Sequence, residues 1–362
     1  MPPRHPRTFP GLRLCSGPSS ALLSAAVSEQ SNSEKLVAVT GAAGHVGGNL
    51  VRSLLAQGRR VRALVREHTA GIDGLPVEVV RCDVTDAQAC RRALAGAPVV
   101  YHLAARISVG WDPPGPVEAV NLGGTRNVVE ACLACGVKRL VHFSSIHAFT
   151  ADPVDGVIDE SRPLVQSQPH LLVYDRTKAE GERQVMAAVA RGLDAVIVNP
   201  SSVLGPFDFS PSAMGEALIE IHNGRFPALV GGAGFDWVDV RDVVASALQA
   251  ETRGRKGAHY LLTGHWLSFV ELAQLWGKVS GAKIPRLVAP MWLARAAAPL
   301  VAAWSRLRGQ RPLFTSDSLR VLRNHRQISH ACANAELGHN PRPLEETLRD
   351  TYQWFKQAGK LA

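Results

Sequence analysis

Residues 35–58, KLVAVTGAAGHVGGNLVRSLLAQG, decide the fold of this 362-residue chain. The first six residues form a short apolar run rich in β-branched side chains, which is typical of a buried parallel strand. A glycine-rich turn follows, and then a segment that places its leucines and valine on one helical face and ends at Gly58. The stretch therefore predicts a strand, a tight turn and a helix in succession.

The same rhythm continues along the chain as far as Pro200. Short apolar runs alternate with helical segments, and the connections are short enough for right-handed crossovers. The six runs are residues 35–40, 59–67, 77–86, 97–105, 137–145 and 193–201. This alternation predicts an α/β fold built on a Rossmann-type doubly wound parallel sheet.

Beyond Pro200 the alternation of strand and helix breaks down. Residues 206–235 and 263–362 contain loops and amphipathic helical patterns, and we expect them to form a smaller, mostly helical C-terminal substrate-binding lobe. Residues 236–262 return to a strand and a helix. We therefore expect residues 35–205, completed by about 236–262, to make up the first domain.

Three glycines, Gly41, Gly44 and Gly47, lie between the first predicted strand and the first predicted helix. In that context the first allows a tight turn, the second lets the backbone approach a pyrophosphate, and the third lets the helix pack on the strand. The helix N-terminus then faces the phosphate charge. The first domain is therefore predicted to bind a dinucleotide. The other turn residues expected beside it are Ala43, His45 and Val46.

The end of the second predicted strand decides between NAD and NADP. NAD binding usually requires an acidic residue there, which accepts hydrogen bonds from the ribose hydroxyls. Arg66 occupies this place, and Glu67 is displaced by one. An arginine can pair with a 2′-phosphate, a contact worth roughly 1.5–3 kcal/mol or roughly 10- to 100-fold in affinity. We expect NADP(H), with NAD(H) as the alternative, and Asp83 is placed to meet the adenine amine.

Tyr174 is one of 4 tyrosines and stands four positions before Lys178. Residues at i and i+4 share a helix face, so the phenol and the ammonium should point the same way. We expect the ammonium, together with a positive nicotinamide ring, to lower the phenol pKa from its usual value near 10. The phenol can then exchange a proton with a substrate oxygen as a hydride moves. Ser144 and Ser145, after the fifth strand, offer a hydroxyl to the same oxygen.

Seven segments resemble, in chain order, those of the extended short-chain dehydrogenases/reductases, the NAD-dependent epimerase/dehydratase superfamily. They are TGAAGHVG, CDVTD, VYHLAA, NLGGTRNVVEAC, RLVHFSSI, YDRTK and NPSSVLGP, and the likeness covers about residues 35–355. VRALVR and FSSI resemble most closely the dihydroflavonol 4-reductase and 3β-hydroxysteroid dehydrogenase branch. The resemblance implies an NAD(P)-dependent oxidoreductase acting on CH–OH groups, with Ser145, Tyr174 and Lys178 as its catalytic group.

The same resemblance implies further site residues. Asn121 resembles the family's active-site asparagine, which supports the lysine through water. His147 follows the catalytic serine and is either a substrate contact or a packed strand-end histidine, whereas His102 is expected to be structural. The remaining cofactor contacts are Val84, Leu103, Ala104, Ala105, Pro200, Ser202 and Val203, and the substrate contacts are Arg106, Ser145 and His147.

Three functions remain open. The first is an NADP(H)-dependent oxidoreductase that interconverts a ketone or aldehyde and a secondary alcohol on a small apolar, dihydroflavonol- or sterol-like substrate. The second is a nucleotide-sugar epimerase with tightly bound NAD, which Arg66 disfavours. The third is a non-catalytic NADP-binding regulatory protein, which the intact catalytic group disfavours. Family dehydratases carry an acidic pair after the catalytic hydroxyl, whereas Ile146 and His147 stand here.

Composition limits the partners. The formal net charge of +9 favours anionic ligands, but no block of basic residues interleaved with aromatics indicates nucleic acid. Cys132 and Cys135 lack a second ligand pair, so we expect no metal site. The lobe's large apolar residues suggest an apolar ligand only weakly, because core packing explains them equally well. They are Trp237, Trp266, Trp276, Met291 and Trp292.

Location and assembly are the least constrained features. We expect residues 1–34 to be a disordered or targeting extension, because their basic, serine-containing composition resembles a transit peptide, unless translation begins near Val27. We expect a cytoplasmic protein, with organelle import if the extension is translated. The apolar residues 289–309 contain Arg295 and Pro299, which favours a buried helix or peripheral membrane contact over a span. Related proteins are often homodimers.

Overall fold

The largest feature of the computed structural model is a seven-stranded sheet with the order β10-β6-β5-β4-β1-β2-β3, in which all neighbouring strands are parallel. The structure describes residues 36–108, 113–153, 156–166, 168, 171–226, 228–298 and 327–361. The strands are β1 (Leu36–Thr40), β2 (Arg60–Val65), β3 (Glu78–Arg81), β4 (Val99–His102), β5 (Arg139–Phe143), β6 (Ala195–Pro200) and β10 (His259–Leu262). The strand order reverses between β1 and β4, where doubly wound sheets bind their ligands.

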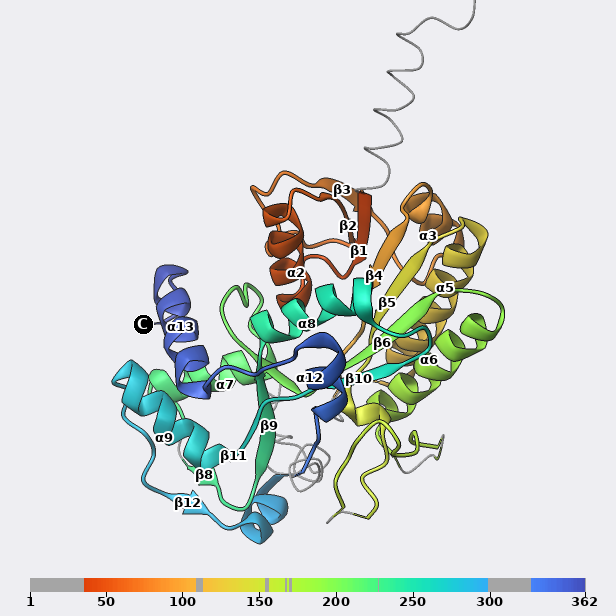
Figure 1. The fold of residues 1–362 in the computed structure, drawn as a ribbon. Helices are drawn as coiled ribbons and strands as arrows, with labels where there is room; N and C mark the ends of the chain where they lie inside the picture. Colours follow the sequence, from red (N-terminus) through yellow and green to blue (C-terminus); the bar gives the residue numbers. More distant parts are fainter. Residues whose placement is uncertain are drawn as a thin grey trace, which may run out of the picture.

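Helices cover both faces of this sheet (Figure 1). One face carries α2 (His45–Ala56), α8 (Val240–Arg253) and α12 (Ala331–Leu337), and the other carries α3 (Ala87–Leu94), α5 (Thr125–Ala134) and α6 (Val173–Ala190). Successive residues of β1 serve the two faces in turn, since Val37 and Val39 join one core cluster and Leu36 and Ala38 the other. Burial on both faces explains the near-continuous apolar runs. The α/β prediction and all six predicted strands are confirmed.

The region 236–262 contributes to two different sheets. Its last strand, β10, pairs with β6 and adds a seventh strand to the six predicted ones. Its first strand, β9 (Gly234–Asp239), lies instead in a separate sheet with β7 (Ser202–Leu204) and β11 (His265–Ser268). A two-stranded sheet joins β8 (Leu229–Val230) to β12 (Val288–Ala289). The C-terminal region therefore contains strands as well as the expected helices.

The C-terminal helices surround a core of their own. Helices α7 (Ala213–His222), α9 (Phe269–Ser280) and α13 (Leu344–Gln357) pack with the strands of the small sheets. Trp237 and Trp276 are fully buried there, so core packing accounts for both, whereas Trp292 is 70% exposed. The apolar segment 289–309 is described only up to residue 298, and among the described helices none is long and apolar enough to cross a bilayer.

Candidate active site

The turn between β1 and α2 places its three glycines in different surroundings. Gly41 has a φ of +67°, and a Cβ on it would lie 2.8 Å from the backbone nitrogen of Ala104. A Cβ on Gly47 would lie 2.1 Å from the carbonyl oxygen of Gly41. A Cβ on Gly44, the N-cap of α2, would meet only that oxygen, at 3.4 Å. The backbone is thus open to close approach at Gly44, and these residues fit a pyrophosphate at the helix N-terminus.

Thr40 aligns the ends of β1 and β4 beside this turn. Its hydroxyl accepts hydrogen bonds from the backbone nitrogens of Leu103 and Ala104, each over 3.1 Å. Nδ1 of His102 lies 2.7 Å from the same hydroxyl. Burial and the Lys178 charge lower the pKa of His102 to about 3, so the ring is neutral at physiological pH. His102 thus holds the strands together, and the predicted cofactor segment 103–105 begins beside the glycine turn.

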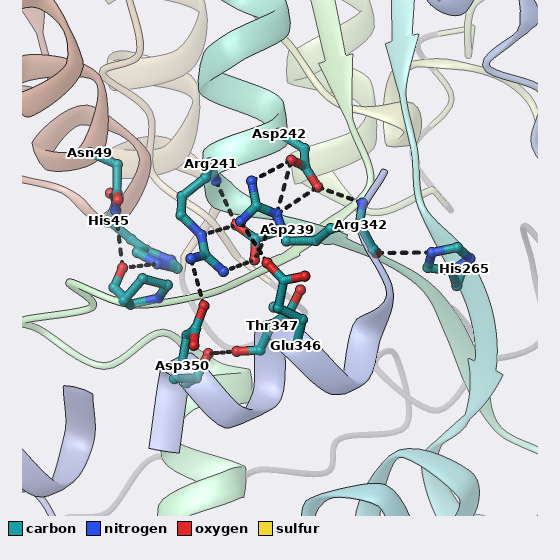
Figure 2. A network of polar contacts seen from close by, with 12 residues as sticks. His45, Asn49, Asp239, Arg241, Asp242, His265, Arg342, Glu346, Thr347 and Asp350 are labelled. Atoms are coloured by element: carbon teal, nitrogen blue, oxygen red, sulfur yellow. Dashed lines mark hydrogen bonds and ion pairs between the residues drawn. The ribbon is translucent and has the colours of Figure 1, made fainter. Parts of the chain in front are cut away.

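The other predicted turn residues point into the protein. Nε2 of His45 lies 3.1 Å from the Pro206 carbonyl oxygen, which also accepts a hydrogen bond from Nδ2 of Asn49 over 3.1 Å (Figure 2). Ala43 and Val46 pack on the core cluster beneath α2. The structure therefore gives the His45 ring a protein partner and places Ala43 and Val46 against the core.

At the adenosine end, Arg66 follows β2 with an exposed guanidinium 3.6 Å from the carboxylate of Glu67. Arg81 donates hydrogen bonds to the carbonyl oxygens of both Arg66 and Glu67, so it fixes the backbone from which they project. The hydrogen bonds of Thr85 and the charge of Arg66 lower the pKa of Asp83, which is therefore ionised. Arg81 was not predicted, because its contacts depend on the pairing of β3 with β2, which places it beside the end of β2.

Val84, which follows Asp83 in the sequence, is buried and packs against α5. A Cβ on Gly124 would lie 2.6 Å from its Cγ2, so Val84 and the start of α5 are in close contact. Its carbonyl oxygen also accepts a hydrogen bond from Asn127 over 2.9 Å. These contacts fix the end of β3 that carries Asp83.

The predicted catalytic residues come together at the carboxyl edge of the main sheet. Tyr174 and Lys178 lie on α6, with the Lys178 ammonium 6.0 Å from the centre of the tyrosine ring. Nζ of Lys178 donates a hydrogen bond of 3.0 Å to the carbonyl oxygen of Phe143, the last residue of β5. Ser145 follows β5 as the N-cap of the 3-10 turn η2 (Ile146–Ala148), and its side chain acts to lower the pKa of Tyr174. Among the described residues, the neighbouring Ser144 hydroxyl has no hydrogen-bond partner.

Burial sets the protonation of this group. It raises the pKa of Tyr174 to about 12, although the hydrogen bond from Ser145 acts in the opposite direction. Burial also lowers the pKa of Lys178 to about 8, against the raising effect of Glu182. The expected lowering of the phenol pKa by Lys178 is therefore wrong in direction for the protein alone. The reason is that the ammonium is directed at the Phe143 carbonyl, while the phenol loses its hydration.

Asn121 lies on a π-helical turn, η1 (Ala119–Gly124), between α4 (Pro114–Glu118) and α5. Its side chain accepts a 2.8 Å hydrogen bond from the Arg106 backbone nitrogen and donates one of 3.1 Å to the Arg106 carbonyl oxygen. It also donates to Oγ1 of Thr177 over 3.1 Å. Asn121 therefore joins the segment after β4 to the helix of Tyr174 and Lys178, and it holds Arg106 by the backbone.

His147 and the predicted segment 200–203 lie at the same edge of the sheet as the catalytic group. The His147 ring packs edge-on against Tyr174, with 5.9 Å between ring centres, and its Nδ1 lies 3.3 Å from the Asp175 carboxylate. Pro200 ends β6, and Ser202 and Val203 continue into β7, so these residues lie at the same carboxyl edge. The structure thus brings both positions to the edge where the catalytic residues lie.

Comparisons with known proteins identify the family. The model of the NAD dependent epimerase/dehydratase family matches residues 37–262. The chain is 37% identical to sterol demethylase protein B of Methylococcus capsulatus over 89% of this chain and 99% of the relative. It is 31% identical to a putative dihydroflavonol 4-reductase of Synechocystis over 89% of this chain and 94% of the relative.

Solved structures agree with this likeness. The crystal structure of gox2253 matches with a TM-score of 0.78 and 30% identity, over 91% of this chain and all 100% of that one. The chain therefore belongs to the NAD-dependent epimerase/dehydratase family, the extended short-chain dehydrogenases/reductases. It is an NAD(P)-dependent oxidoreductase, similar to the dihydroflavonol reductase and 3β-hydroxysteroid dehydrogenase branch.

Proposed function

We propose that this chain uses NADP(H) to interconvert a carbonyl group and a secondary alcohol on a small apolar substrate. The observation that carries the proposal is the cluster of Ser145, Tyr174 and Lys178 at the carboxyl edge of the sheet, the edge at which the glycine turn follows β1. Bound NADPH would supply the hydride to the carbonyl carbon. The residues that would hold it are those of the turn at Gly44, Arg66 and the segment 103–105.

Residues of the protein then bind the substrate oxygen and donate a proton to it. The Ser145 hydroxyl donates a hydrogen bond to it and so holds the carbonyl in place. Tyr174 is protonated at neutral pH, because burial keeps the phenol pKa near 12. It can therefore donate its proton to the oxygen as negative charge develops there. The Lys178 ammonium, charged below pH of about 8, stabilises the phenolate that remains.

The test of this mechanism is Tyr174→Phe. The variant keeps the ring that packs on His147 but cannot donate the proton, so we expect kcat for NADPH-dependent ketone reduction to fall roughly 10²- to 10⁴-fold. Fluorescence titration should show unchanged NADPH affinity. Ser144→Ala is the matched control, since this hydroxyl lies beside Ser145 without a partner among the described residues. Turnover retained by Tyr174→Phe would refute the assigned proton donor.

Preference for NADP(H) is the second part of the proposal, and Arg66 supports it. Its guanidinium is exposed at the end of β2, and its neighbour Glu67 holds it only loosely. Arg66→Ala should weaken NADPH binding roughly 10- to 100-fold and leave NADH binding unchanged. Titration of both nucleotides measures the difference directly. Equal losses of affinity for the two nucleotides would instead mean that Arg66 stabilises the fold and does not select NADPH.

The apolar nature of the substrate is supported by the names of the relatives, a sterol demethylase protein and a dihydroflavonol 4-reductase. The competing function is nucleotide-sugar epimerisation, because a nucleoside-diphosphate-sugar epimerase from Pseudomonas aeruginosa matches with a TM-score of 0.73 and 25% identity. NAD that co-purifies with the protein, without net reduction of ketones, would favour the epimerase. Ile146 and His147 in place of an acidic pair argue against dehydration.

The assignment of cofactor binding and substrate binding to different regions of the chain is also a proposal. We assign dinucleotide binding to residues 35–205 with about 236–262, and substrate binding to 206–235 and 263–362. Separate core clusters support the assignment, since two flank the main sheet and a third lies among α7, α9 and α13. A homodimer remains our expectation for assembly, and sedimentation velocity would test it.

A further inference from the structure

Glu182 is a fully buried carboxylate in the same helix as the catalytic pair, and it has no role in the mechanism above. Tyr174, Lys178 and Glu182 recur at four-residue intervals along α6 and therefore share one face. The exposed fraction of Glu182 is 0%. An ionised carboxylate removed from water is strongly unfavourable unless hydrogen bonds and opposite charge compensate it. Its partners should therefore reveal what it does.

Those partners connect it to the catalytic serine. Nδ2 of Asn199, on β6, donates a 2.6 Å hydrogen bond to Oε1 of Glu182 and a 3.1 Å hydrogen bond to the carbonyl oxygen of Ser145. One amide group thus spans the carboxylate and the strand end that carries the Ser145 hydroxyl. Nδ1 of His259, on β10, lies 3.1 Å from the other oxygen, Oε2.

The second connection is electrostatic. Lys178 is desolvated, which lowers its pKa to about 8, and the negative charge of Glu182 one turn away acts in the opposite direction. Burial is the main cause that lowers the pKa values of His102 on β4 and His142 on β5, and the Lys178 charge lowers both further, so these two rings are neutral. The other groups that face α6 here are His259, already paired to Glu182, the His147–Asp175 pair at η2, and Glu118 of α4, 3.7 Å from Arg176.

We propose that Glu182 is a positioning residue of the active site, which holds the Lys178 ammonium in its charged form and fixes the Ser145 strand end through Asn199. The inference rests on the proposed role of Lys178 in proton transfer. Without the negative charge, the buried ammonium would be less favourable, and Lys178 would lose its proton at a lower pH. A phenolate formed at Tyr174 would then lack its neighbouring positive charge.

The test is the pH dependence of Glu182→Gln. Glutamine keeps the shape and can still accept the hydrogen bond from Asn199, so the variant removes chiefly the charge. Because the pKa of Lys178 is about 8, we expect the alkaline limb of the native kcat profile to fall near that pH and to move roughly one pH unit lower in the variant. The matched control is Glu180→Gln, which removes the same charge from the same helix where it pairs with Arg183 over 3.1 Å. Its profile should be unchanged.

NMR of the protein with labelled lysine side chains tests the inference without turnover. Lys178→Met identifies the signal of Lys178. The pKa of Lys178 should fall in Glu182→Gln and should stay unchanged in Glu180→Gln. If the native protein reduced no ketone but this shift were present, the proposed function would fail and the inference would stand. An unmoved Lys178 titration refutes the inference, whatever the activity.

A third measurement uses the unmodified sequence, in case Glu182→Gln does not fold. The inference requires Glu182 to be ionised at pH 7. Labelled glutamate side chains, with Glu182→Asp to identify the signal, report this directly by NMR. A neutral Glu182 carboxyl at pH 7 would overturn the proposal.

Discussion

The glycines of the turn after β1 differ in the room that an added Cβ would have. Alanine substitutions at them should therefore separate an effect on cofactor binding from an effect on stability. A Cβ at Gly47 would lie 2.1 Å from the Gly41 carbonyl oxygen, so Gly47→Ala forces α2 away from β1. We expect the Gly47→Ala variant either not to fold or to lose about 3 kcal/mol of unfolding free energy. Gly44→Ala has room within the protein and should fold with unchanged stability.

The two alanine variants should separate again when cofactor binding is measured. The methyl group at Gly44 projects where the backbone would approach the pyrophosphate, so NADPH affinity should fall at least roughly 10-fold. Thermal unfolding and fluorescence titration of both variants check this. Equal affinity of Gly44→Ala and the native protein would mean that the phosphates do not bind at this turn.

The sequence predicted which side chains lie together better than it predicted how burial changes their pKa values. Spacing alone was enough to place Tyr174 and Lys178 on one helix face, and the structure puts them 6.0 Å apart, from ammonium to ring centre. In the protein without cofactor the pKa of Tyr174 lies above its usual value, because burial raises it and burial is a tertiary property that residue spacing does not report. Glu182 has the same four-residue spacing, but nothing in the sequence distinguishes a buried glutamate from the surface glutamates beside it.

At the level of elements, the strands were predictable where both faces are buried, and the exceptions depend on pairing. The run at 259–262 became the seventh strand only because it pairs with β6, while β9 was drawn into the small sheet with β7 and β11. The segment around Asn121 is a π-helical turn, a local form that tertiary contacts such as those to Arg106 and Thr177 select and that the sequence pattern does not indicate.

The π-helical turn has a consequence for activity. Such a turn contains one residue more than an α-helical turn would, and this extra residue sets the direction of Asn121. Deletion of Gly123 should restore regular helix, rotate Asn121 away from Arg106 and Thr177, and lower kcat about 100-fold. Gly123→Ala keeps the turn, and its Cβ would meet no atom within 4 Å, so it should retain native activity. Comparable losses in the two variants would show that the turn itself is unimportant.

At the scale of the whole molecule, the C-terminal segment joins the main sheet to the substrate-binding region. Helix α12 packs on α8 and β10, and α13 packs on α9. Between them lies the polar network of Figure 2, in which Arg241 and Arg342 both approach the fully buried carboxylate of Asp239, at 2.7 Å and 3.6 Å. Arg342 also forms a 2.8 Å ion pair with Asp242, and Arg241 one of 2.6 Å with Asp350 on α13.

Loss of Arg342 should therefore destabilise the protein as a whole. Arg342→Met leaves the buried carboxylates of Asp239 and Asp242 with less positive charge, which costs about 2–4 kcal/mol of unfolding free energy. The control is Arg349→Met on α13, where an arginine exposed by 55% pairs with Glu345 one turn away. Its loss should cost less than about 0.5 kcal/mol. Urea unfolding followed by tryptophan fluorescence compares the variants.

The same network predicts how stability responds to acid. Burial would raise the pKa of Asp239, but the hydrogen bonds and charge of Arg241 lower it overall. A carboxyl whose pKa is lower in the folded state stabilises the protein above its unfolded pKa of about 3.9 and loses that contribution as the pH falls through the folded value. The native protein should thus lose more stability between pH 5 and pH 3 than Arg342→Met, because removing a cation raises the Asp239 pKa towards its unfolded value. Parallel losses in this window would mean that Arg241 alone sets the ionisation of Asp239, and that Arg342 acts only through Asp242.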